Sequence, residues 1–154
     1  MDWFAKAFIK ASLTWLGLGV TLGVGMAIHL PWIVYRPAHM HMNLLGFVAM
    51  MIFGVAYHVV PRFTGHALHS RGLAGRHWWI ANSGLALMVV GFAFRPHASP
   101  AATPLLATGG VLSALGAYAF IYNIWSTIDA RARGSDVPAQ ALHRDGKSPA
   151  RMPR

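Results

Sequence analysis

The chain has 154 residues, of which 55% are hydrophobic and only 11% are charged, with a mean hydropathy of +0.44. This composition predicts an integral membrane protein of one domain rather than a soluble one. Cysteine is absent, which excludes disulfides, iron–sulfur clusters and thiolate zinc sites. The basic residues that give the net charge of +9 lie between and beyond the apolar segments. We therefore interpret them as an orientation signal and expect no nucleic acid partner.

Four apolar segments are long enough to cross a hydrocarbon core, which needs about 20 helical residues. The predicted spans are residues 8–30, 38–60, 77–94 and 105–128. Pro31 follows the first span, Pro37 starts the second and Pro61 ends it, while Thr103 and Pro104 suit the N-cap and first turn of the fourth. The predicted fold is an all-α, four-transmembrane-helix bundle whose first span is an uncleaved signal anchor.

The basic residues are distributed unequally between the two sides of this bundle. Eleven lysines and arginines fall on the side of the termini, and only Arg36 and Arg95 fall on the other. The positive-inside rule then predicts a multi-pass protein of the cytoplasmic (inner) membrane with both termini cytoplasmic. Residues 1–128 form the predicted membrane domain, and residues 129–154 are predicted to be a basic, disordered cytoplasmic tail.

The second span opens with the pair His39 and His41. Imidazole is costly to bury in hydrocarbon unless a partner satisfies its ring nitrogens, so both side chains are candidate ligands for a metal or for haem iron. Since the chain has no cysteine, haem would be held non-covalently, as haem b. Residues two apart in an α-helix point about 200° apart, so the pair addresses opposite sides of the helix.

Helical geometry divides the second span into two faces. The His39 face is mixed and partly small, with Gly46, Met50 and Gly54, and the His41 face is an aliphatic stripe. We predict that the His39 face looks into the bundle, where the glycines leave room for a flat cofactor and Gly46 and Met50 line it. Close packing of helices is an equal explanation for the glycines. The His41 face is predicted to meet lipid or another subunit.

The segment from His39 to Trp79 resembles two helices of the catalytic subunit of the haem–copper oxidases, nearest to the cbb-type and nitric oxide reductase branches. The shared pattern is His39-Met40-His41, Leu45-Gly46, Met50-Met51, Gly54, Tyr57, Pro61-Arg62, Gly65, Leu73 and His77-Trp78-Trp79. The resemblance implies that His39 binds a high-spin haem and that His41 binds a low-spin haem. A second alignment, on Arg36-Pro37-x-His39, resembles another helix of the same subunit and also makes His39 a haem ligand.

The chain departs from this family in having four spans and no counterpart of the helices that bind copper. We therefore predict no copper site and no full oxygen reduction, and leave open whether the protein is an enzyme. The second axial ligand is predicted to be His29, His97 or a histidine of a neighbouring copy. Arg36 and Arg95, the two cations of the outer side, are the expected partners of haem propionates.

The remaining histidines are weaker candidates. His58 and His77 lie near the inner end and could form a second haem site, but an interfacial, water-satisfied position is the favoured interpretation. The others, His66, His69 and His143, fall in predicted loop or tail.

Small residues predict close helix contacts. Gly19 and Gly23 form a small-xxx-small pattern in the first span, which serves contacts within a chain or between chains equally well. Because four helices leave much of a haem edge uncovered, we predict a homo-oligomer with haem at a subunit interface.

Three functions compete. The favoured one is a membrane cytochrome b that transfers electrons, with quinol or a cytochrome as redox partner, or binds a diatomic gas such as oxygen or nitric oxide. The second is an accessory or sensor protein that handles haem or metal for an oxidase or a nitric oxide pathway. The third, a non-haem channel or transporter, has little support because the predicted spans carry no carboxylate.

Overall fold

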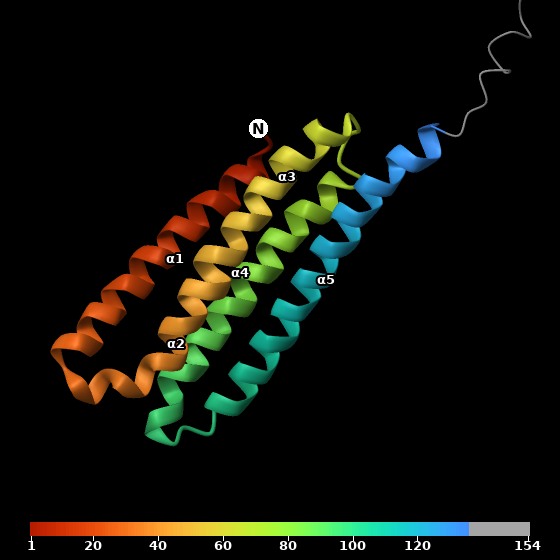
Figure 1. Ribbon diagram of the computed structural model, residues 1–154. Helices are drawn as coiled ribbons and strands as arrows, with labels where there is room; N and C mark the ends of the chain where they lie inside the picture. Colours follow the sequence, from red (N-terminus) through yellow and green to blue (C-terminus); the bar gives the residue numbers. More distant parts are fainter. Residues whose placement is uncertain (136–154) are drawn as a thin grey trace, which may run out of the picture.

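The computed structural model describes residues 1–135, and this part of the chain is all helical (Figure 1). Its elements are α1 (Trp3–Ile28), η1 (Leu30–Tyr35), α2 (Arg36–His41), η2 (Met42–Ala49), α3 (Met50–Thr64), α4 (Arg71–Phe94), η3 (Arg95–His97) and α5 (Ala102–Ser135). Among the described residues four helical segments are long and apolar enough to cross a membrane: Trp3–Ile28, Leu30–Thr64, Arg71–His97 and Ala102–Ala130. The predicted membrane bundle is confirmed to this extent.

The helices extend beyond the predicted spans because capping, rather than hydropathy, sets their ends. α4 begins at Arg71 instead of residue 77, since the hydroxyl of Ser70 accepts a hydrogen bond from Leu73 N–H at 3.2 Å. α3 continues past Pro61 to Thr64, and Gly65 caps it with a φ of 72°, the left-handed conformation that glycine adopts readily. α5 runs into the segment predicted as a disordered tail, and residues 136–154 lie outside the described part.

The bundle consists of two antiparallel hairpins. In one hairpin α1 packs on η2 and α3, and in the other α4 packs on α5; contacts of α3 with α5 and of α2 with α4 join the two. One end of the bundle, called the terminal end below, carries the N-terminus, the loop between α3 and α4 and the last described turn of α5 (Figure 1). The opposite, distal end carries η1 and η3.

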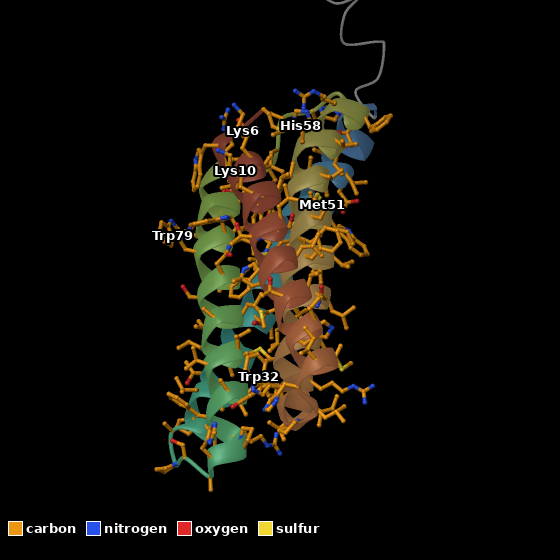
Figure 2. The ribbon with its side chains drawn as sticks, turned by 90° about the vertical axis from the view of Figure 1, so that its left-hand side faces the viewer. Lys6, Lys10, Trp32, Met51, His58 and Trp79 are labelled. Atoms are coloured by element: carbon orange, nitrogen blue, oxygen red, sulfur yellow. The ribbon has the colours of Figure 1, made fainter. Side chains whose placement is uncertain are left out.

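Figure 2 shows which residues lie at each end. The basic residues Lys6 and Lys10 lie toward the terminal end, as does His58, and the aromatic residue Trp32 lies toward the distal end. Trp79 projects outward in the same view and is 64% exposed, as expected of an aromatic residue at a membrane interface.

Glycines bring the backbones of α4 and α5 into close contact. A Cβ atom built on Gly109 would lie 2.6 Å from the carbonyl oxygen of Gly84, and one built on Gly84 would lie 2.8 Å from the backbone nitrogen of Ser113. Only glycine permits this backbone approach. Gly109 and Ser113 of the fourth span therefore serve a contact within the chain.

Candidate functional site

His39 and His41 lie in α2 at the distal end of the bundle. The 3₁₀ turn η1 leads the chain from α1 into α2, and Pro37 occupies the first turn of α2, where its missing N–H costs no hydrogen bond. The pair is therefore held on a short helix whose start is fixed by η1 and whose end runs into η2.

η2 is a π-helix, and it changes which side chains of this span face inward. The buried positions recur every four residues, at Ala38, Met42, Gly46, Met50 and Gly54. In a regular α-helix a spacing of four drifts by about 40° per step. The wider π turn reduces this drift and keeps the stripe aligned. Ala38 and Met42 thus take the inward positions, and the two histidines lie on either side of them.

His39 packs against α1. Its Nδ1 donates a hydrogen bond to the carbonyl oxygen of Gly19 at 2.8 Å, and a Cβ on Gly23 would lie 2.8 Å from its Cε1 atom. The carbonyl of His39 in turn accepts from the side-chain amide of Asn43 at 2.8 Å. Gly23 therefore makes room for this imidazole within the chain, and Gly19 makes room for the side-chain amide of Asn43, whose nitrogen would lie 2.6 Å from a Cβ there.

His41 packs on the other side, against α4. Its Nδ1 donates to the carbonyl oxygen of Pro37 at 2.8 Å, and its ring centroid lies 4.7 Å from that of Phe92. Val48, Ile52 and Val55 on this side are exposed, and the His41 imidazole is half-buried on α4, so contact of this side with lipid or another subunit stays a prediction.

These two hydrogen bonds determine the tautomer of each ring. A carbonyl oxygen only accepts, so Nδ1 carries the proton in both histidines, and in the neutral ring Nε2 keeps its lone pair. At His39 the 2.8 Å contact with Gly19 outweighs a 3.4 Å contact with the amide nitrogen of Asn43, which already donates to the His39 carbonyl. Histidines that bind metal characteristically donate their other ring N–H to a carbonyl or carboxylate in this way. Neither Nε2 has a hydrogen-bond partner in the described residues and neither is fully buried, so each keeps its lone pair free.

His58 has the opposite arrangement. Its Nδ1 lies 2.6 Å from an Arg62 guanidinium nitrogen, which can only donate, so the lone pair of His58 is already used at Nδ1. A neutral His58 in this arrangement has no free lone pair for haem iron, which argues against the predicted second site at His58.

The other predicted residues of the distal end are exposed and are not gathered around the pair. Arg36, Arg95, His29 and His97 are all exposed. His97 Nε2 lies 3.1 Å from the hydroxyl of Tyr35, and the His29 ring is edge-on to the ring of another η1 residue. Within residues 1–135 no hydrogen bond, ion pair or aromatic contact joins any of these four to His39 or His41.

Gly46 does not leave room for a cofactor, contrary to prediction. A Cβ there would lie 2.5 Å from Cβ of Trp15 and 3.0 Å from a methyl of Leu85, so α1 and α4 already fill the space. Met50 is 2% exposed and belongs to the hydrophobic core. Close helix packing, the alternative explanation of these glycines, is the correct one.

A groove of about 360 Å³ does lie beside α2. Its walls come from α1, η1, α2, η2 and α4: Leu22, Trp32, Tyr35, Ala38, Met42, Val89 and Ala93. No histidine lines it, so the histidine Nε2 atoms and this groove are separate features of the distal end.

His77 is fully buried, whereas the sequence predicts an interfacial position. α4 starts at Arg71, earlier than the predicted span, and this carries His77 into the core. Its Nδ1 lies 3.0 Å from the hydroxyl of Tyr57, and the rings of Phe8, Phe53 and Phe120 surround it. The N-cap residue Ser70 was the sequence signal that could have shown this position. Enclosure by aromatic rings leaves no room for haem, which contradicts a second site at His77.

The described part of the chain has no cluster of side chains that could hold a metal ion by itself. No three His, Asp or Glu side chains among residues 1–135 come together as a metal site. Haem is compatible with this arrangement, since the porphyrin supplies four ligands and the protein only the axial ones. The donor chemistry of His39 and His41 fits that requirement, at the surface of the bundle.

Comparisons with known proteins give partial matches. No family model matches the chain. Cbb3-type cytochrome c oxidase subunit CcoN1 of Stutzerimonas stutzeri is 34% identical over 91 residues, covering 53% of this chain and 19% of the relative. Cytochrome c oxidase subunit 1 of Rhodobacter capsulatus is 28% identical over 131 residues, covering 66% and 25%. The chain is thus related to subunit I of the haem–copper oxidases, while it spans a quarter or less of these relatives' length.

Proposed function

We propose that this chain is a membrane b-type haem protein in which Nε2 of His39 and Nε2 of His41 bind haem iron. The observation that carries the proposal is the pair of hydrogen bonds from Nδ1 to backbone carbonyls, which leaves both Nε2 lone pairs free. The relationship to oxidase subunit I supports haem as the group that these nitrogens would bind.

The two ligands would serve different iron atoms. His39 packs on α1 and His41 on α4, on opposite sides of one helix. Because the interior next to them is filled by Trp15 and Leu85, each haem would lie on the outside of the four helices. A second copy of the chain would then cover it, and a homo-oligomer with haem at the interface is part of the proposal.

Axial ligation would decide what the protein does. Iron with two histidine ligands transfers electrons, whereas iron with one keeps a position open for oxygen, nitric oxide or carbon monoxide. The second ligand would come from His29, His97 or a histidine of the neighbouring copy, and quinol or a cytochrome would be the redox partner. Arg36 and Arg95 would approach the propionates of a surface haem, because both side chains are exposed at the same end.

An absorbance spectrum of protein purified after expression with sufficient haem tests the proposal. We expect a Soret band and its loss or shift in His39→Ala and in His41→Ala, with no change in the control His69→Ala, whose side chain lies in the loop at the terminal end. A protein without a Soret band refutes haem binding. A carbon monoxide shift would identify iron with an open position.

A rescue experiment separates ligation from structural support. We expect free imidazole to restore the spectrum of His41→Gly, because it can occupy the vacated ligand position. Imidazole cannot replace the helix contact that a merely structural histidine would make. His41 is not a ligand if His41→Gly folds and has the same haem absorbance spectrum as the unaltered chain, and added imidazole does not change that spectrum.

The orientation proposed for the chain is that of a cytoplasmic-membrane protein with both termini inside. It is supported by the concentration of basic residues at the terminal end, such as Lys6, Lys10, Arg62 and Arg71. Reporter fusions after residue 135 test it: a cytoplasmically active reporter should work there, and an enzyme active only outside the cytoplasm should not.

A further inference from the structure

A polar pocket lies at the terminal end, away from the histidine pair. It occupies about 310 Å³ between the start of α1, the end of α3, the following loop and the start of α4. The lining residues are Met1, Asp2, Tyr57, His58, Pro61, Arg62, Ala67, Leu68 and Arg71. Charged and titratable side chains from α3, from α4 and from Asp2, the N-cap of α1, therefore converge on one cavity.

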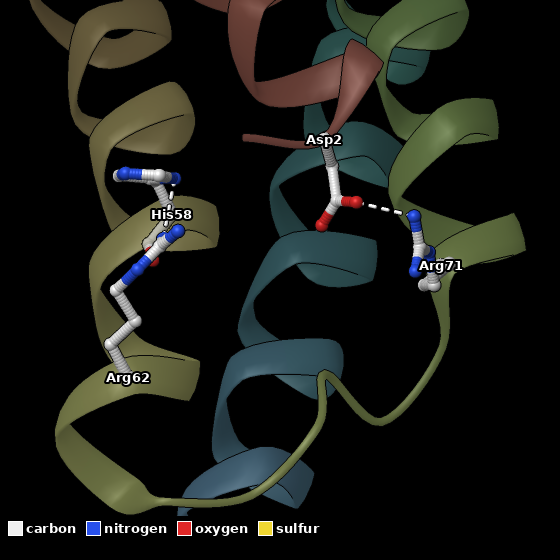
Figure 3. A network of polar contacts seen from close by, with 4 residues as sticks. All are labelled: Asp2, His58, Arg62 and Arg71. Carbon is white, nitrogen blue, oxygen red and sulfur yellow. Dashed lines mark hydrogen bonds and ion pairs between the residues drawn. The ribbon is translucent and has the colours of Figure 1, made fainter.

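Arg62 is positioned by its own helix. One guanidinium nitrogen, NH1, donates to Nδ1 and to the carbonyl oxygen of His58, both at 2.6 Å (Figure 3). The remaining guanidinium N–H groups have no partner within the described part of the chain. Because Nδ1 of His58 accepts, its Nε2 carries the proton and is a further donor.

Arg71 lies on the other side of the pocket and is paired with Asp2 (Figure 3). This is the one salt bridge found among the described residues, so Arg62 has no acidic partner there. α4 starts at Arg71, and the N-terminal end of a 24-residue helix adds partial positive charge beside the cavity. The pocket therefore has a net positive potential and several unused donors, which favours an anion.

The rest of the lining is apolar, from Pro61, Ala67 and Leu68. The pocket also lies where two membrane-length segments meet the surface, at the end of Leu30–Thr64 and the start of Arg71–His97. Phospholipid headgroups occupy this level of a bilayer, and basic pockets between transmembrane helices are known to bind them. A small soluble anion would use the donors but not the apolar wall.

We propose that this pocket binds the phosphate group of an anionic phospholipid, with Arg62, Arg71 and His58 Nε2–H as donors and the apolar wall against the glycerol region. The site is independent of haem, since its residues lie at the opposite end of the bundle from His39 and His41. It would fix one lipid between α1, α3 and α4, at the side where most of the basic residues lie.

Retention of lipid by the full chain tests the proposal. The protein is reconstituted in nanodiscs of phosphatidylcholine with one part in five phosphatidylglycerol, extracted and examined by native mass spectrometry. We expect retained phosphatidylglycerol in preference to phosphatidylcholine, and about tenfold or greater loss of that preference in Arg62→Gln, because the charge-assisted hydrogen bonds from the guanidinium group to the phosphate are lost.

The matched control is Arg76→Gln, which removes the same charge from an exposed position of α4 outside this pocket. It should change the preference by less than about twofold, as expected of a general surface charge. Equal losses in Arg62→Gln and Arg76→Gln, or no preference in the unaltered chain, overturn the proposal.

A second arm distinguishes the source of the phosphate. Inorganic phosphate is titrated onto the protein in nanodiscs of phosphatidylcholine alone, and binding is followed by the change in intrinsic fluorescence. No saturable binding at millimolar phosphate is the expected result for a lipid site. Saturable binding abolished by Arg62→Gln would reassign the site to a free phosphate compound and overturn the lipid assignment.

Discussion

Tyr57 and His77 form a hydrogen bond inside the aromatic core, 3.0 Å from the hydroxyl to Nδ1, although neither side chain reaches solvent. The other ring nitrogen of His77, Nε2, has no partner among the described residues. Buried polar groups without partners cost free energy. The bond to Tyr57 is the one hydrogen bond that the His77 ring makes among the described residues.

Tyr57→Phe should destabilise the bundle by about 1–3 kcal/mol, because it leaves both nitrogens of His77 without partners. Unfolding in detergent, followed by circular dichroism, measures the change. Tyr118→Phe is the control, since that side chain is 68% exposed and should have no effect. Adding His77→Phe to Tyr57→Phe should restore most of the stability, and a double variant less stable than Tyr57→Phe would contradict this account.

Gly23→Ala should disturb His39. The new methyl group would lie 2.8 Å from Cε1 of the imidazole, so the ring or α1 must move, at a cost of about 1–3 kcal/mol. If His39 binds haem, the Soret band shifts or weakens. Gly17→Ala, in the same helix and with no neighbouring atom within 4 Å in the described structure, should leave the spectrum unchanged. Identical spectra for the two variants would contradict the proposed role of His39.

Gly46→Ala should destabilise the contact between α1 and η2. The methyl group would meet Cβ of Trp15, which is close to the backbone and cannot rotate away, so a loss of about 1–3 kcal/mol is expected. Thermal unfolding in detergent measures it. Gly110→Ala is the matched change in an open position of α5 and should be neutral or slightly stabilising. If Gly46 lined a cofactor slot instead, Gly46→Ala would lower haem content without changing the stability of the haem-free chain.

Asn123→Ala should loosen the junction of α4 and α5 at the terminal end. The buried amide accepts from Ser70 N–H at 2.9 Å and donates to the Ser70 carbonyl at 2.8 Å, thereby holding the N-cap of α4. Losing both bonds should cost about 1–3 kcal/mol and increase hydrogen exchange at the start of α4. Thr14→Ala, an exposed residue bonded within its own helix, is the control. Unaltered exchange in Asn123→Ala would show that another contact holds this end.

Much of the bundle follows from hydropathy and helical spacing. Helical geometry alone predicts the inward position of Gly46, Met50 and Gly54, and all three are buried. Helix ends were less predictable, because Arg71 and Arg76 lower the hydropathy of the first turns of α4 and hid the N-cap at Ser70. His77 was misplaced for this reason.

Two features of the candidate site could not be predicted from local pattern. Whether the space at Gly46 is open depends on Trp15, which is distant in sequence and reaches it only after α1 packs. The π turn of η2 adds no recognisable residue type to the sequence, yet it places Ala38 and Met42 inward and moves the histidines to the flanks.

That π turn also means that the direction of the two imidazoles is set by the width of η2. If Met42–Ala49 formed a regular α-helix with the same number of residues, everything before it would rotate relative to α3 by roughly 100°, the angle of one residue. The contacts below Met50 would stay in place, while His39 and His41 would exchange their neighbours on α1 and α4 for others. A change in helix type, with no change in any ligand, would be sufficient to redirect the site.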